Sequence, residues 1–320
     1  MPEVAHRDLD QALQGAEVMW RAARGVSIFL TGGTGFIGSW LVDLFREANA
    51  RFNLAARLVV LTRQSRVSPD PAVCFHRGDV RSFQFPEGDF SYVIHGANAV
   101  FDEPALEETI LAGTDRVLCF CAGRRPAKLL YLSSGAVYGA RPSRAGAIAE
   151  DSPLGPPASR YARAKQIAES MCGAFPATIA RGFAFIGPRL PLDGGFAAGN
   201  FLRDRLARRP LRVEGNGRAV RSYLYASDLA AWLWTLLFRG EAGRVYNVGS
   251  DQAVTVRELA RRIAAPVGLP VEVRGGETGD SYYVPSIERA RRELGLEVRV
   301  GLDEAIRRTV EWHLSTPRPV

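Results

Sequence analysis

The sequence has few cysteines and no long apolar segment, and both shortages exclude classes of protein. The four cysteines form no CxxC pair and show no metal-ligand spacing with the four histidines, so neither a zinc site nor a disulfide framework is expected. The longest apolar run, Leu229–Phe238, is half the length needed to cross a bilayer, and the chain does not open with a cationic start and an apolar block. We expect a soluble, cytoplasmic protein with no metal and no membrane partner.

Lysine is almost absent, since only two of the 41 basic residues are lysines. The formal net charge is +7, but the arginines alternate with acidic residues, as in "IERARREL". This pattern indicates solvated helix faces rather than a nucleic-acid surface, with binding of anionic small ligands as the alternative. One of the two lysines, Lys165, lies in "SRYARAKQ", where another arginine would match the rest of the chain.

Short apolar runs alternate with segments of helical periodicity from residue 26 onward. This alternation predicts an α/β fold with a Rossmann-type doubly wound parallel sheet, followed by a smaller C-terminal α/β substrate lobe. The predicted strands are 26–31, 57–62, 72–77, 91–96, 128–134, 176–183 and 244–249.

Three units are expected along the chain. They are an N-terminal helical extension (1–24), a dinucleotide-binding domain (25–185, to which 222–250 return) and a substrate-binding lobe (186–221 and 251–320). Within the extension, residues 6–23 predict one amphipathic helix. Its apolar contacts are expected from Leu9, Leu13, Val18 and Trp20.

Three glycines between the first predicted strand and the following helix give the strongest local signal. Gly32, Gly35 and Gly38 form GxxGxxG, where the first makes a tight turn, the second lets the backbone approach a diphosphate and the third allows close packing of helix and strand. The helix N-terminus then offers unpaired N–H groups to the phosphates. Asp79, after the third strand, is placed to accept from an adenine amino group, although a plain turn aspartate would look the same.

The end of the second strand distinguishes between the two nicotinamide cofactors. A carboxylate there binds the ribose 2′-hydroxyl of NAD, whereas the 2′-phosphate of NADP needs a cation instead. This chain has Thr62 and Arg63 at that point and no acidic residue. We therefore expect NADP(H) to be preferred, with NAD(H) possible and with Arg63 as a plain surface arginine as the alternative.

The position of Lys165 relative to Tyr161 gives a reason for a lysine at this place. They are spaced i, i+4 on a predicted helix and share a face. An ammonium beside a phenol is expected to lower the tyrosine pKa, which makes the phenol a usable proton donor or acceptor. Ser134 follows a predicted strand and could donate to a substrate oxygen near Tyr161, or could simply cap the strand end.

These motifs resemble the extended short-chain dehydrogenase/reductase family, in its branch of nucleotide-sugar epimerases, dehydratases and reductases. The resemblance covers residues 26–314 and rests on "TGGTGFIGS", "GDV", "IHGAN", "SSGAVYG", "YARAK" and "YNVGS". It implies that Ser134, Tyr161 and Lys165 are catalytic. It also implies cofactor contacts at Phe36, Ile37, Val80, Ala97 and Lys165, and substrate contacts at Ser134, Asn200, Phe201, Val213 and Arg221. Asn200 as a helix cap and Arg221 as a solvated side chain are the alternatives.

The sequence departs from the family pattern at four places. Family dehydratases carry acidic residues after the catalytic hydroxyl, and sugar-acid decarboxylases carry a glutamate, but here Gly135 and Ala136 hold those positions. Elimination of water then has no evident acid and base. Ala184 replaces an asparagine of the family, and Tyr283 stands where a second arginine for the diphosphate is expected.

The resemblance and its departures together predict an NADP(H)-dependent oxidoreductase that reduces a nucleotide-linked 4-keto-6-deoxy sugar. A nucleotide-sugar 4-epimerase with the same three catalytic residues is the alternative, and a non-catalytic protein that senses cofactor is a third possibility. Family dimers imply a homodimer through the helices near 104–123 and 158–174. The apolar positions expected to serve that contact include Ile110, Leu111, Leu118 and Phe120.

Overall fold

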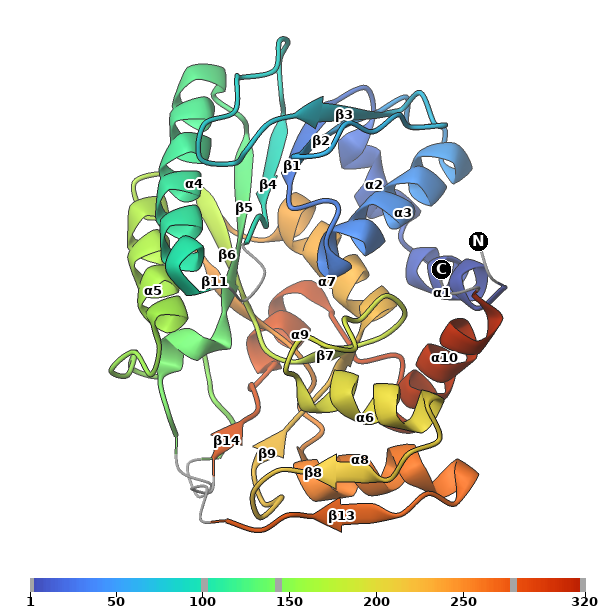
Figure 1. Cartoon of the computed structure of the whole chain (residues 1–320). Helices are drawn as coiled ribbons and strands as arrows, with labels where there is room; N and C mark the ends of the chain where they lie inside the picture. The colour runs from blue at the N-terminus through green and yellow to red at the C-terminus, as the bar shows by residue number, and fades with distance from the viewer. Residues whose placement is uncertain (1–2, 99–102, 142–145, 277–280, 317–320) are drawn as a thin grey trace.

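A seven-stranded parallel sheet forms the centre of the larger lobe (Figure 1). Its strand order is β11-β6-β5-β4-β1-β2-β3, which confirms the predicted Rossmann-type doubly wound fold. Each predicted strand agrees with an observed one to within one residue at either end. The strands are β1 (Ser27–Thr31), β2 (Arg57–Thr62), β3 (Val73–Arg77), β4 (Tyr92–His95), β5 (Lys128–Ser134), β6 (Ala177–Gly182) and β11 (Val245–Val248).

The computed structural model describes residues 3–98, 103–141, 146–276 and 281–316. Residues 1–2 and 317–320, at the ends of the expected extension and substrate lobe, lie outside the described residues. Within these ranges no helix combines the length and the apolar character needed to cross a membrane. The four cysteines are free thiols, and no cluster of metal-ligating side chains occurs among the described residues.

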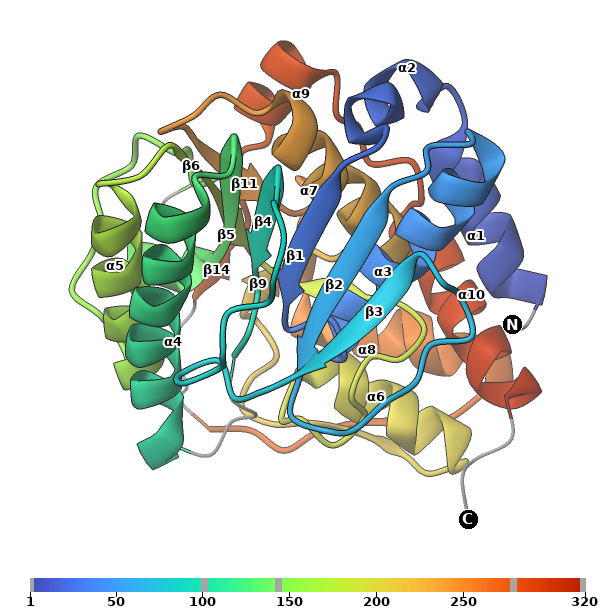
Figure 2. The same cartoon turned by 90° about the horizontal axis from the view of Figure 1, so that it is seen from above.

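Helices cover both faces of the sheet, as the view from above shows (Figure 2). On one face α4 (Glu103–Arg124) and α5 (Arg160–Cys172) pack side by side, and on the other lie α3 (Phe36–Arg51) and α7 (Ala226–Arg239). Because both faces are covered, the central strands are almost continuously apolar and buried. Ile110 and Phe120 of α4, expected to face a partner, are instead buried in the chain's own core.

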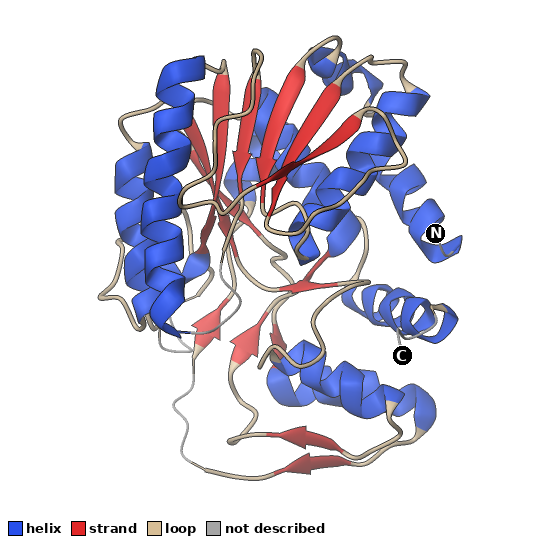
Figure 3. Ribbon diagram, turned by 45° about the horizontal axis from the view of Figure 1, so that its top comes forward, coloured by secondary structure: helices blue, strands red, loops and turns tan. Residues whose placement is uncertain are grey.

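Short strands and helices form the smaller lobe below the sheet (Figure 3). Its own apolar core joins α6 (Ala197–Leu206), α8 (Val256–Ala264) and α10 (Leu302–Ser315), while α9 (Glu288–Leu294) returns to the main sheet. Short strand pairs connect the pieces. These strands are β7 (Phe185–Ile186), β8 (Leu211–Val213), β9 (Val220–Arg221), β10 (Leu224–Tyr225), β12 (Val254–Thr255), β13 (Val271–Val273) and β14 (Tyr282–Tyr283).

The N-terminal extension contains two helices where one was expected. Helix α1 (Glu3–Leu13) ends before Gly15, whose φ of +72° breaks the helix, and α2 (Glu17–Trp20) follows. Leu9, Leu13 and Trp20 are buried as predicted, but Val18 is 77% exposed. The prediction for Val18 was wrong because the break at Gly15 rotates the second helix relative to the first.

Candidate active site

The glycine loop between β1 and α3 is packed tightly at Gly32 and Gly38 and is open at Gly35. Gly32 has a φ of +80°, and a Cβ there would lie 2.5 Å from the oxygen of Gly96. A Cβ on Gly38 would overlap the oxygen of Gly32, so both positions require glycine for the chain's own packing. A Cβ on Gly35 would meet that oxygen at an ordinary 3.5 Å. The absence of a side chain at Gly35 therefore leaves room for a ligand rather than for the protein.

The first turn of α3 points free N–H groups at the same place. The backbone N–H of Ser39 donates to the oxygen of Gly35, the N-cap residue, so the N–H groups of Phe36, Ile37 and Gly38 have no acceptor within the helix. Unpaired N–H groups at a helix N-terminus bind phosphate. The loop and helix start therefore fit the diphosphate of a dinucleotide.

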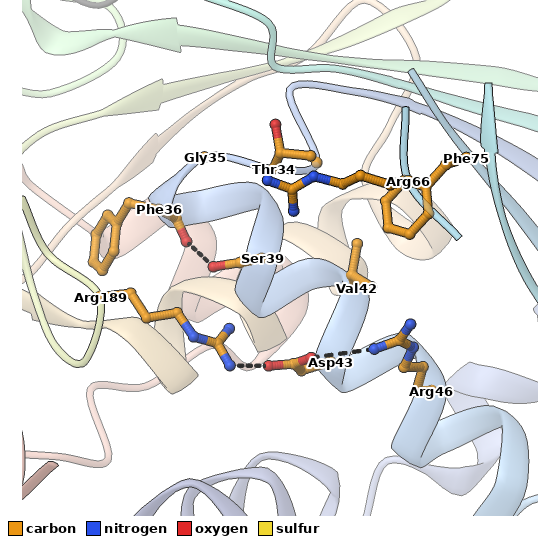
Figure 4. Close-up of a pocket in the computed structure, with 11 residues that line it drawn as sticks. Thr34, Gly35, Phe36, Ser39, Val42, Asp43, Arg46, Arg66, Phe75 and Arg189 are labelled. Atoms are coloured by element: carbon orange, nitrogen blue, oxygen red, sulfur yellow. Dashed lines mark hydrogen bonds and ion pairs between the residues drawn. The ribbon is translucent and has the colours of Figure 1, made fainter. Parts of the chain in front are cut away.

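A cavity of about 380 Å³ adjoins this loop and contains three arginines (Figure 4). Arg66 reaches over the loop from the segment after β2, and Arg46 and Arg189 lie along α3 on either side of Asp43. The Arg189 guanidinium donates to the Asp43 carboxylate at 2.6 Å, whereas Arg46 lies 4.0 Å away from it. The cavity is lined by Gly33, Thr34, Gly35, Phe36, Ser39, Val42, Asp43, Arg46, Arg66, Phe75 and Arg189.

Arg63, the residue predicted to read the 2′-phosphate, does not line this cavity. It is exposed directly after β2, while the buried hydroxyl of Thr62 accepts from the N–H of Gln64. Arg66 occupies the cavity instead, and sequence reasoning missed it, although it lies in the same loop as Arg63. The direction of a side chain in an irregular loop follows no sequence period.

Asp79 follows β3 and Ala97 follows β4, so both lie at the carboxyl edge of the sheet. The Arg81 side chain and backbone N–H donate to Asp79 at 2.8 to 3.1 Å, and the pairing with Arg81 lowers the pKa of this carboxyl. Asp79 is thus an ionised hydrogen-bond acceptor. The N–H of Ala97 donates to the Thr31 hydroxyl at 3.1 Å, which holds this segment beside the glycine turn. Val80 is buried in the core.

The structure brings Ser134, Tyr161 and Lys165 together. Ser134 is the last residue of β5, and Tyr161 and Lys165 lie in the first two turns of α5. That helix begins there because the Ser159 hydroxyl caps it by accepting from the N–H of Ala162 at 3.1 Å. The Ser134 hydroxyl lies close enough to the Tyr161 phenol to favour its ionised form, and the Lys165 ammonium lies 5.9 Å from the centre of the Tyr161 ring.

The pKa of Tyr161 is raised, so the expected lowering by Lys165 was wrong. Burial of the phenol disfavours the phenolate, and the hydrogen bond from Ser134 only partly offsets this effect. Burial also lowers the pKa of Lys165 to about 8. The i, i+4 spacing places the two groups on one face of the helix, but it does not show how far the fold shields them from water.

The residues expected to hold the substrate lie in the smaller lobe. Asn200 belongs to the first turn of α6, and its N–H donates to the oxygen of Phe196. Phe201 and Val213 are buried, so only their main chains could reach a ligand. Arg221 donates to the oxygen of Val220 at 2.7 Å and to the Ser281 hydroxyl at 3.0 Å. Their contact with a substrate stays a prediction.

Comparisons with known proteins show which proteins this chain is similar to. The model of the NAD dependent epimerase/dehydratase family matches residues 28–249. UDP-glucuronic acid decarboxylase 6 of Arabidopsis thaliana is 30% identical over 303 residues, which cover 87% of this chain and 86% of that protein.

Two solved structures share the fold. A dTDP-glucose 4,6-dehydratase of Streptomyces venezuelae with NAD bound has a TM-score of 0.77 and 25% identity, covering 90% of this chain and 97% of that one. An epimerase of Methanothermobacter thermautotrophicus has a TM-score of 0.81 and 22% identity, covering 94% and 96%.

Proposed function

Because the chain belongs to the NAD dependent epimerase/dehydratase family, we propose that it reduces a nucleotide-linked 4-keto-6-deoxy sugar with NADP(H). One observation carries this choice within the family. Ser134, Tyr161 and Lys165 gather at the carboxyl end of β5, while the two residues after Ser134, Gly135 and Ala136, have no ionisable side chain. These groups can move a proton at one carbinol centre, but they give no acid or base for a second centre.

The chain's own residues supply proton transfer and orientation. Bound NADPH supplies a hydride to the carbonyl carbon. The Tyr161 phenol, kept protonated by its raised pKa, donates its proton to the carbonyl oxygen, and the Ser134 hydroxyl orients that oxygen. Lys165, with a pKa of about 8, is largely an ammonium at neutral pH and can donate to the ribose hydroxyls.

Two features support NADP(H) over NAD(H). Strand β2 ends at Thr62 without a carboxylate, and the cavity beside the glycine loop contains Arg46, Arg66 and Arg189. The Asp43 carboxylate is already paired with Arg189, so the Arg66 guanidinium is the cation best placed for an added phosphate. The relative from Streptomyces venezuelae binds NAD, which makes the arginine cavity the feature to test.

The substrate experiment separates reduction from its alternatives. The protein is incubated with a panel of nucleotide sugars, with and without NADPH, and the products are identified by mass spectrometry. We expect a 4-keto-6-deoxy sugar nucleotide to consume NADPH stoichiometrically. Conversion to a C4 epimer without net consumption of cofactor would instead assign the 4-epimerase, and a dehydrated product from a 6-hydroxylated sugar would contradict the interpretation of Gly135 and Ala136.

The homodimer is also a proposal. It would form through the outer surfaces of α4 and α5, where Leu111 and Leu118 are half-buried and Ile167 is 37% exposed. The nucleotide diphosphate is expected between the main sheet and the smaller lobe, near Arg221.

A further inference from the structure

Tyr283 enters the active site from the smaller lobe. It lies in β14, directly opposite Arg221 of β9. On the other side of this segment, the N–H of Ile148 donates to the oxygen of Val284 at 2.9 Å. The main chain at Tyr283 is therefore held by hydrogen-bonded segments on two sides, which fixes the position of its Cα atom.

Aromatic packing fixes the position of the Tyr283 ring. The Tyr283 ring lies against the Phe183 ring with 4.6 Å between their centres, and the Arg221 guanidinium lies 5.9 Å from the centre of the Tyr283 ring. The phenol oxygen lies 3.4 Å from the oxygen of Gly182, which is long for a hydrogen bond between two oxygens. This weak contact leaves the phenol proton available to another acceptor.

The phenol fills the space beside Gly135. A Cβ at Gly135 would lie 2.8 Å from the Tyr283 phenol oxygen and 2.8 Å from the Phe183 ring, closer than real Cβ atoms approach other atoms. The φ of Gly135 lies outside the left-handed region, so its backbone does not require glycine. Gly135 therefore has no side chain where the Tyr283 phenol needs the space.

Ser134 lies between two phenols. Its oxygen accepts from the N–H of Ala136 at 3.2 Å, and its hydroxyl favours the ionised forms of both Tyr161 and Tyr283, which places it near both phenols. A serine hydroxyl has one proton and two lone pairs. Burial raises the pKa of Tyr283, so this phenol stays protonated and can donate. If Ala136 and Tyr283 occupy both lone pairs, the proton of Ser134 is left to point to Tyr161 or to a substrate oxygen.

We propose that Tyr283 is a positioning residue of the active site, whose phenol fills the space beside Gly135 and directs the Ser134 proton toward Tyr161 and the substrate carbonyl. The proposal rests on the proposed function, in which Ser134 orients the carbonyl oxygen. It also assigns a neutral hydrogen-bond donor to the space beside Gly135, where family dehydratases place a carboxylate.

The first test replaces Tyr283 with phenylalanine, which removes one oxygen and keeps the ring. We expect kcat to fall about tenfold while KM changes little, because the substrate grip remains and the orientation of Ser134 is lost. The pKa of Tyr161 should rise, since the hydrogen bond from Ser134 lowers it in the unmodified protein. The alkaline limb of the pH–rate profile should therefore move to higher pH.

Tyr282→Phe is the matched control, because it makes the same chemical change at the neighbouring position, on the opposite face of the strand. The pKa of Tyr161 is measured without substrate by titrating the phenolate absorbance with pH. In the unmodified protein and in each variant, the part that belongs to Tyr161 is the part that an added Tyr161→Phe substitution removes. If Tyr283→Phe changes kcat and the pKa of Tyr161 no more than Tyr282→Phe does, the proposal is wrong.

A double-mutant cycle tests the match between Tyr283 and Gly135. Gly135→Ala should lower kcat and the melting temperature more in the unmodified protein than in Tyr283→Phe, where the oxygen nearest the new methyl is gone. Additive effects would overturn the match. If the unmodified protein epimerises its substrate instead of reducing it, the proposed reduction fails, and Tyr283 is still judged by the Tyr161 titration and by the epimerisation rate.

Discussion

The Lys165 ammonium donates a 2.8 Å hydrogen bond to the main-chain oxygen of Leu132, two residues before Ser134 on β5. This bond ties helix α5 to the end of the strand that carries the serine. Lys165 is buried, and the Tyr131 ring lies 4.9 Å from its ammonium. The lysine is thus held by the protein itself before any ligand arrives, which is a form of preorganisation.

Cofactor affinity should depend on the protonation of Lys165. Burial lowers its pKa to about 8, so the ammonium that we propose donates to the ribose hydroxyls is lost as the pH rises through that value. We expect the Kd for NADPH to increase above about pH 8, measured by fluorescence titration. Lys165→Met should bind more weakly and without this pH dependence. An unchanged pH dependence in Lys165→Met would assign the effect to another group.

The same pKa predicts an opposite trend for stability without cofactor. In the unfolded chain Lys165 should titrate near the ordinary value of 10.5, so between about pH 8 and that value the unfolded state binds more protons than the folded state. The contribution of Lys165 to the free energy of unfolding therefore rises with pH across this window. Urea titrations of the unmodified protein and Lys165→Met should differ in this direction.

Tyr161→Phe should abolish most of the turnover while leaving cofactor binding intact. A positioned general acid contributes about 10²–10⁴-fold, and we expect a loss of at least about a hundredfold in kcat. The glycine loop and Lys165 remain, so the Kd for NADPH should stay within about twofold of the unmodified value. Turnover near the unmodified rate would show that another group donates the proton.

Strands were predictable from the sequence because they are buried on both faces. An apolar run of five or six residues such as β1 or β2 can bury itself in few ways, and its ends follow from neighbouring turn residues. The break between α1 and α2 was not predicted, because Gly15 is tolerated within helices and its positive φ is set by packing.

The candidate site was predictable where local spacing decides it. The glycine turn and the shared face of Tyr161 and Lys165 follow from positions a few residues apart. The contact between Gly135 and Tyr283 joins residues 148 positions apart, and the burial that raises the pKa of Tyr161 depends on the whole surrounding fold. Neither is encoded in a short motif.

Arg66 should contribute more than Arg63 to the choice between NADPH and NADH. Loss of a charge-assisted contact to the 2′-phosphate costs about 1.5–3 kcal/mol. Arg66→Ala should weaken NADPH binding by that amount and leave NADH binding nearly unchanged, as measured by calorimetric titration. Arg57→Ala, at the opposite end of β2, is the control. A larger effect of Arg63→Ala would restore the original prediction, and tighter binding of NADH by the unmodified protein would contradict the preference for NADP(H).

The proposed dimer makes α4 and α5 sensitive to charge. Ile167→Glu places a carboxylate on the outer surface of α5, and it should shift a dimer of about twice 34.9 kDa toward the monomer in light scattering. Val18→Glu is the control, because Val18 is 77% exposed on α2. A monomer at micromolar concentration in the unmodified protein would exclude the dimer.

The N-terminal extension should stabilise the fold through one buried carboxylate. Asp8 of α1 is fully buried, where it accepts from the Tyr225 phenol and from the Arg308 guanidinium, each at 2.6 Å. Three segments far apart in the sequence therefore meet at Asp8. Asp8→Ala removes this partner from Arg308 and Tyr225 in a dry environment, while Arg308 keeps its 2.6 Å bond to the Glu304 carboxylate. We therefore expect a loss of about 1–3 kcal/mol in the free energy of unfolding, the cost of leaving a buried hydrogen-bonding group unpaired.

The matched control is Asp10→Ala on the same helix. Asp10 is exposed and pairs with Arg51 at the surface, where an ion pair contributes at most about 1 kcal/mol. Urea denaturation of both variants compares their free energies of unfolding. A loss for Asp8→Ala no larger than that for Asp10→Ala would mean that the Asp8 contacts contribute no more than a surface ion pair does. The apolar contacts of Leu9 and Leu13, which are buried in both variants, would then be the main attachment of α1.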